Sequence, residues 1–89
     1  MYAVIVMKKA KKDIRNLAHQ DQSRITKSIT VLGQSLPTRP SNWNSFGPNT
    51  RPSQEYGADR KMTVGKFRVL TIIDDSAQRV AIPRVFRRG

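Results

Sequence analysis

Apolar and polar positions follow two different periods in the first part of this 89-residue chain. Residues 2–7 (YAVIVM) form a short β-branched run, which predicts a strand. Residues 8–20 change to helical spacing, with apolar positions recurring every three or four residues and lysines on the opposite side. A second helical pattern starts at Asp21, the predicted N-cap, and ends between Gly33 and Pro37, and its apolar positions are Ile25, Ile29 and Leu32. Two helices joined by a few polar residues predict an αα-hairpin, whose apolar side must pack on a sheet.

The middle of the chain, residues 37–59, shows no period and holds four of the five prolines. A segment of this length without regular spacing predicts a long Pro-rich loop, which either binds a partner or is partly disordered. Three aromatic residues are spaced through it. They either attach the loop to the body of the domain or dock a partner and stack on bases. These residues are Trp43, Phe46 and Tyr56.

Three strand-like runs follow the loop, at residues 60–64, 67–73 and 79–85, and short Gly- or Asp-containing turns separate them. The chain is too short for a second core, so residues 1–89 are expected to form one domain. The predicted fold class is α+β in the order βααβββ. We expect an antiparallel sheet with the N-terminal αα-hairpin packed on one face, and the first strand beside a C-terminal strand.

The net charge of the chain restricts the classes of function that it favours. The chain has seventeen Lys and Arg residues and six acidic residues, so its net charge is +11. Residues 60–89 alone hold eight basic and two acidic residues. Such an excess predicts binding to a polyanion, foremost a nucleic acid, with an acidic protein partner as the alternative. With no cysteine, a single histidine and no apolar run long enough to cross a membrane, we expect a cytoplasmic protein without metal or cofactor.

Arg68 interrupts the apolar strand predicted at 67–73. Strand alternation places it on the same face as Leu70 and Ile72. Helices that cover one face of the sheet cannot easily accommodate an unpaired guanidinium, so we expect Arg68 at the rim of the other face. We favour a phosphate site there, where several cations converge. The alternative is an ion pair with an acid, for which the candidates are Asp74, Asp75 and Glu55.

The sequence resembles the RelE/ParE superfamily of bacterial toxin–antitoxin toxins, over nearly the whole chain in element order. The tail VGKFRVLTIIDDSAQRVAIPRVFRR is similar to the family's Gly-x-aromatic-Arg strand, acidic turn and closing strand ending in Val-x-basic-Arg, and AKKDIRNL is similar to its first-helix pattern. The resemblance implies a small α/β toxin with an acidic antitoxin partner. We favour the RelE branch, a ribosome-dependent mRNA endoribonuclease. The alternatives are a ParE-like toxin that acts on DNA gyrase without cutting RNA, and an inactive relative that binds antitoxin or nucleic acid.

The same resemblance implies a catalytic set consisting of Lys61, Arg68, Arg87 and Arg88. Arg68 is the arginine of the Gly-x-aromatic-Arg motif and Arg88 closes the last strand, so both would neutralise charge on phosphoryl oxygens. Arg87 stands where the family often has His or Lys. Thr63 replaces one cation of the family's basic pair, which leaves Lys61 as the candidate base. The family's late catalytic aromatic or histidine has no counterpart, and the proton donor is not identified.

A further group of basic residues is predicted to contact RNA phosphates without reading sequence. Most of them crowd the start of the first helix, where the alternative is a solvated helix face. His19 is expected to be a surface or cap residue rather than a catalyst. The predicted RNA-contacting residues are Lys8, Lys9, Lys11, Lys12, Arg15, Arg60, Lys66 and Arg84.

Overall fold

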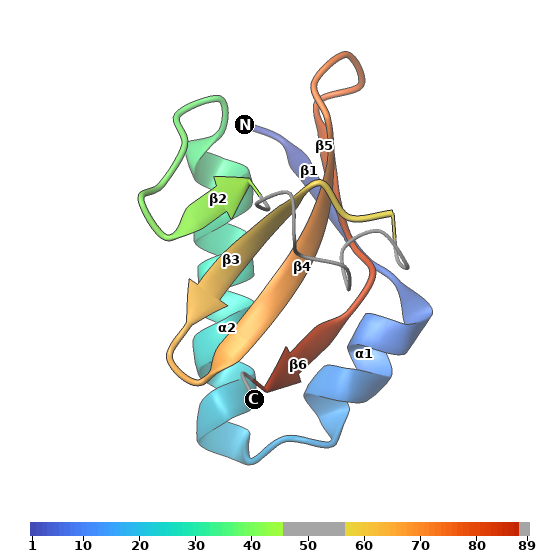
Figure 1. The fold of residues 1–89 in the computed structure, drawn as a ribbon, viewed down its shortest axis with the longest axis vertical. Helices are drawn as coiled ribbons and strands as arrows, with labels where there is room; N and C mark the ends of the chain where they lie inside the picture. Colours follow the sequence, from blue (N-terminus) through green and yellow to red (C-terminus); the bar gives the residue numbers. More distant parts are fainter. Residues whose placement is uncertain (46–56, 88–89) are drawn as a thin grey trace.

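A computed structural model describes residues 1–45 and 57–87, which form two helices and one sheet. The elements are β1 (Ala3–Val6), α1 (Lys8–Arg15), α2 (His19–Ser35), β2 (Trp43–Ser45), β3 (Arg60–Val64), β4 (Phe67–Asp74), β5 (Arg79–Ile82) and β6 (Val85–Arg87). The sheet has the strand order β1-β5-β4-β3-β2, and β6 also pairs with β4. Figure 1 shows α2 behind β3 and β4, and α1 beside β6. The predicted α+β fold class is confirmed.

The sheet differs from the prediction in three details, the first being the short strand β2, which lies within the segment predicted as a loop and pairs with β3. The first strand of the chain does lie beside a C-terminal strand, but β1 and β5 run parallel, whereas every other described pairing is antiparallel. No tight hairpin joins β1 to β5, so the connection leaves their relative direction free. The strand predicted at 79–85 is divided between β5 and β6 around Pro83, which has no N–H to contribute to a ladder. Both pieces pair with β4.

The helical hairpin is present, but α1 ends well before residue 20 and α2 begins before the predicted cap. The N-cap of α2 is Ala18, and the predicted cap Asp21 lies within the first turn. A carboxylate in the first turn is still favourable, because the helix dipole is positive there. The side chain of Gln22 donates a hydrogen bond of 2.8 Å to the Leu17 carbonyl, which stabilises the short turn between the helices. His19 is the first residue of α2 and is exposed, as predicted.

The hydrophobic core lies between α2 and the sheet, and its strand residues follow the alternation of the pleat. Met62, Val69 and Val85 lie opposite one another on three adjacent strands, and all three are buried. The three apolar positions predicted for α2 are also buried in this core. They are Ile25, Ile29 and Leu32.

Gly33 allows α2 to pack directly against β1. A Cβ at this position would lie 2.5 Å from Cγ2 of Val4 and 3.0 Å from the carbonyl oxygen of Tyr2. The N–H of Tyr2 donates a 2.8 Å hydrogen bond to the Gly33 carbonyl, so the two elements cannot separate without losing it.

Gly33→Ala is therefore expected to destabilise the protein, by about 1–3 kcal/mol from overpacking, less up to about 1 kcal/mol gained in helix propensity. Thermal unfolding followed by circular dichroism measures the difference. Gln34→Ala, at the exposed neighbour in the same helix, serves as the control and should change the stability little. A Gly33→Ala protein more stable than wild type would show that helix propensity outweighs the close contact.

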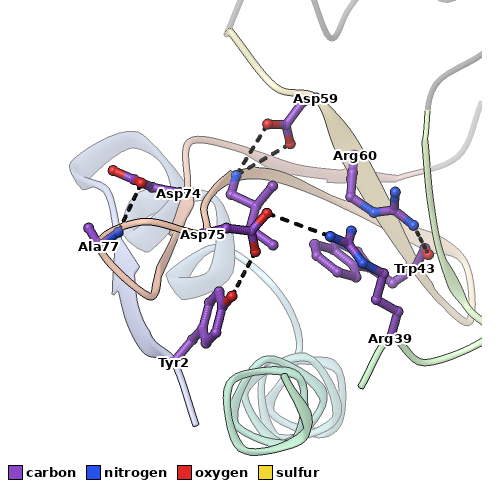
Figure 2. Close-up of polar contacts among 9 residues, drawn as sticks. Tyr2, Arg39, Trp43, Asp59, Arg60, Asp74, Asp75 and Ala77 are labelled. Carbon is purple, nitrogen blue, oxygen red and sulfur yellow. Dashed lines mark hydrogen bonds and ion pairs between the residues drawn. The ribbon is translucent and has the colours of Figure 1, made fainter. Parts of the chain in front are cut away.

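Trp43, the first residue of β2, attaches the segment that follows α2 to the sheet (Figure 2). Its side chain is 1% exposed, and its indole N–H donates a 2.8 Å hydrogen bond to the Thr71 hydroxyl. The guanidinium of Arg60 lies 4.4 Å from the ring centroid and donates to the Trp43 carbonyl at 2.8 Å. The attaching role is therefore confirmed for Trp43. Phe46 and Tyr56 lie outside the described residues.

Candidate nucleic-acid interface

The register of three strands places Arg68 within a small group on the sheet face that is turned away from α2. Arg68 lies opposite Thr63 of β3 and Phe86 of β6. Residues directly opposite in an antiparallel pair share a face, and so do diagonal neighbours. Lys61 of β3 is the diagonal neighbour of Arg68 and therefore lies on the same face. All four side chains are half-buried. We call this group the outer-face cluster, and it consists of Lys61, Thr63, Arg68 and Phe86.

The Arg68 guanidinium has an unsatisfied donor. Its Nε is buried and makes no hydrogen bond to any described residue. A buried N–H without an acceptor is rare in folded proteins, and a charged one is costly to desolvate. The position therefore fits an anion that supplies the missing acceptor, because the guanidinium offers up to five donors in a planar fork.

The acids proposed as alternative partners of Arg68 are engaged elsewhere, as Figure 2 shows for Asp74 and Asp75. Asp74 accepts hydrogen bonds from the Ser76 hydroxyl and the Ala77 N–H, which together hold its pKa below the usual range. Asp75 accepts a 2.7 Å hydrogen bond from the Tyr2 hydroxyl. That bond, together with partial burial, raises the pKa of Tyr2. The third candidate, Glu55, lies outside the described residues.

Asp75 also connects to the Trp43 stack through Arg39. The Arg39 guanidinium lies 3.7 Å from the Asp75 carboxylate and 5.2 Å from the centroid of the Trp43 ring. Burial of Arg60 against the same ring lowers the pKa of its guanidinium, and the nearby Arg39 charge lowers it further. Arg60 thus packs on the helix side of β3, and its contact with RNA stays a prediction.

Arg84, another residue of the predicted RNA-contacting group, forms an ion pair with Asp13. Its Nε lies 2.7 Å from Oδ2 of Asp13, and a second guanidinium nitrogen lies 3.1 Å from Oδ1. The Asp13 carboxylate also accepts the Val85 N–H at 3.0 Å. This two-pronged pair joins α1 to the start of β6, and a bidentate arrangement is the more stable kind of ion pair. Any RNA contact by Arg84 would be additional to this structural role.

Arg87 is not brought together with Arg68. It lies opposite Phe67, on the helix side of the sheet, because consecutive residues of a strand point to opposite faces. Lys66 is exposed in the β3–β4 turn. Arg88 lies outside the described residues, so the described part of the predicted catalytic set comprises Lys61 and Arg68 on one face and Arg87 on the other.

The basic residues of α1 are all exposed, and none forms an ion pair with another described residue. They remain available for the predicted phosphate contacts, and two of them, Lys9 and Lys12, border a cavity of about 270 Å³ beside the Asp13–Arg84 pair. The full set is Lys8, Lys9, Lys11, Lys12 and Arg15.

Two residues on these surfaces were not singled out from the sequence. Phe86 adds an aromatic ring beside Arg68, and strand alternation from Arg84 onward could have placed it there. Arg24 of α2 approaches the β3–β4 turn, and no local sequence signal brings these two segments together.

Within residues 1–45 and 57–87, no three His, Cys, Asp or Glu side chains gather as metal ligands, and neither helix has the length and apolar character to span a membrane.

Comparison with known proteins identifies the fold. No protein-family model and no curated protein sequence matches the chain. Among solved structures, a RelBE toxin–antitoxin complex from Mycobacterium tuberculosis matches with a TM-score of 0.75 and 22% identity, over 98% of both chains. The isolated RelE toxin of E. coli matches with a TM-score of 0.71 and 16% identity, over 100% of this chain and 86% of that one. The archaeal RelE–RelB complex from Pyrococcus horikoshii matches with a TM-score of 0.68 and 16% identity, over 99% and 96%. The chain thus has a RelE-like fold.

Proposed function

We propose that this protein is the toxin of a toxin–antitoxin pair and acts in the cytoplasm as a ribosome-dependent mRNA endoribonuclease. The observation that carries the proposal is the Arg68 guanidinium, whose buried Nε makes no hydrogen bond to a described residue, on the same face as Lys61. The RelE-like fold and the net charge of +11 support the same function.

The proposed chemistry uses the ribose of the RNA itself. The 2′-hydroxyl attacks the adjacent 3′-phosphate and negative charge grows on the phosphoryl oxygens. A bond forms between the 2′-oxygen and phosphorus, the bond from phosphorus to the 5′-oxygen breaks, and the 5′-oxygen takes a proton from water as it leaves. Arg68 binds two of the phosphoryl oxygens through its planar fork. Lys61 lies diagonally across the β3–β4 pair from Arg68. Diagonal neighbours are about 7–8 Å apart, with their Cβ atoms somewhat closer, a separation that lets both side chains reach one phosphate. Lys61 takes the proton of the 2′-hydroxyl in this scheme. Arg88 supplies the second phosphate-binding cation.

The proposed partner is an acidic antitoxin. A chain with +11 charge attracts a negatively charged protein strongly, and such a partner would also neutralise the outer-face cluster. Solved structures with the same fold include a RelBE toxin–antitoxin complex and a complex of RelE with RelB.

A second candidate function is a non-cutting toxin of the same fold that acts on DNA gyrase. Thr63 lies directly opposite Arg68, where the cutting branch would place a second cation, and Arg87 is on the other face. Both features remove positive charge from the outer-face cluster and therefore favour binding over cleavage.

Induced expression without an antitoxin separates these functions. We expect growth arrest, relief of the arrest by an acidic antitoxin, and new 5′ ends within translated messages when primer extension is performed after induction. Growth arrest with DNA breaks and intact messages would establish the gyrase alternative. High-level expression of folded protein without any effect on growth would contradict every toxin function.

A further inference from the structure

A second cationic site lies on the opposite side of the sheet from the outer-face cluster. It is a cavity of about 530 Å³ between the first turns of α2, the β3–β4 turn and the end of β6. Three cations from these three separate elements line it, and we call it the notch. Its lining residues are Gln20, Asp21, Arg24, Gly65, Lys66, Phe67 and Arg87.

The local backbone explains how the three cations meet. Gly65 has a φ of +56°, which permits the tight turn that carries Lys66. A guanidinium nitrogen of Arg24 lies 3.3 Å from the position that a Cβ on Gly65 would occupy, so the Arg24 side chain rests against this turn. Arg87 reaches the notch because its register with Phe67 directs it to the helix side.

The charge of the notch is unbalanced within the described chain. Asp21 is the one acid in its lining, against three cations. None of the three cationic side chains forms an ion pair or hydrogen bond with another described residue. Like charges gathered around one cavity repel each other, and an anion in the cavity would remove that repulsion.

The chemistry of the lining favours a phosphate over an acidic protein segment. Protein partners are held chiefly by apolar and aromatic anchors in their interfaces. The apolar side chain in this lining is Phe67, which is only 8% exposed and offers little surface for such an anchor. A backbone phosphate needs only N–H donors and positive charge, which the guanidinium, ammonium and amide groups of the notch supply.

We propose that the notch binds a backbone phosphate of RNA, so that one RNA strand contacts both faces of the sheet around the end of β6. Arg68 and Arg87 are one register position apart on the paired strands β4 and β6, and they point to opposite faces. The notch therefore flanks the outer-face cluster and would hold the strand next to the phosphate that is cut. This inference rests on the proposed function, because it assigns the notch to the same RNA.

Binding of a single-stranded 2′-O-methyl RNA, which has no attacking hydroxyl, tests the notch apart from cleavage. Fluorescence anisotropy across a range of salt concentrations gives both the affinity and its salt dependence. Arg24→Ala should weaken binding about four-fold at physiological salt and reduce the slope of log K against log salt by about 0.7, the values for one lost phosphate contact on a single strand. The double variant with Arg24→Ala and Lys66→Ala should lose twice as much binding free energy, and its slope of log K against log salt should fall twice as far.

The matched control is Arg79→Ala, which removes an equal charge from an exposed arginine of β5 outside the notch. Arg24 is also exposed, and Arg24→Gln provides a second variant that keeps side-chain length while losing the charge. Equal affinities for the Arg24→Ala and Arg79→Ala proteins would overturn the notch as a phosphate site.

The remaining outcomes separate this inference from the proposed function. If RNA affinity depends on Arg24 but messages are not cut in cells, the notch stands and the nuclease function fails. If messages are cut but RNA affinity is independent of Arg24, the nuclease function stands and the notch fails. If polyglutamate binds in an Arg24-dependent manner and the RNA does not bind, the notch belongs to an acidic protein and the inference is overturned.

Discussion

Arg68→Ala is expected to reduce mRNA cleavage by roughly 30- to 1000-fold while the protein remains folded, which corresponds to about 2–4 kcal/mol of lost transition-state stabilisation. The guanidinium would bind the phosphoryl oxygens on which charge develops. Its loss should affect stability little, because Arg68 forms no ion pair with a described residue and its buried Nε has no acceptor there. Primer extension on cellular messages and thermal unfolding of the purified protein measure the two properties.

Two variants sharpen this test. Arg68→Lys keeps the charge but loses the planar fork, so cleavage should fall to a level between wild type and Arg68→Ala. Arg79→Ala removes an exposed arginine from β5 and should leave cleavage unchanged. The opposite pattern for Arg68→Ala, with full toxicity and a clearly lower unfolding temperature, would mean that this arginine has a structural role.

Trp43→Ala is expected to cause the largest loss of stability, about 3–5 kcal/mol. At roughly 4–8 °C for each kcal/mol in a domain of this size, the unfolding temperature should fall by at least about 12 °C. The substitution would empty a fully buried site and break the 2.8 Å hydrogen bond to the Thr71 hydroxyl. It would also leave the Arg60 guanidinium without the ring on which it lies. Differential scanning calorimetry measures both the temperature and the enthalpy.

Trp43→Phe separates the ring from its hydrogen bond. It keeps most of the buried aromatic surface but removes the indole donor, and we expect a smaller cost, of about 1 kcal/mol for the lost bond in addition to the reduced volume. Val31→Ala, at a side chain that is 47% exposed on α2, should change the stability by no more than about 0.5 kcal/mol. A Trp43→Ala protein as stable as Val31→Ala would show that this segment contributes little to the fold.

Strand alternation was sufficient to predict the face of Arg68, because side chains in a strand alternate with a period of two whatever the strand packs against. The helical period likewise predicted the buried positions Ile25, Ile29 and Leu32. The same alternation separates Arg87 from Arg68, since the register pairs Arg87 with Phe67. The family resemblance groups the two arginines by their positions in the motif, which do not contain the strand register.

Contacts between residues far apart in the chain were decided by the tertiary structure alone. Arg84 pairs with Asp13 across 71 residues, and Arg24 meets the β3–β4 turn only because α2 packs against the sheet. A basic residue has the same local pattern whether it forms an ion pair, stacks on an indole ring or remains available for a phosphate, because the partner determines its role. The sequence by itself therefore determined the elements, the two faces of β4 and the excess of positive charge. Packing decided which cations are structural and which remain to bind an anion.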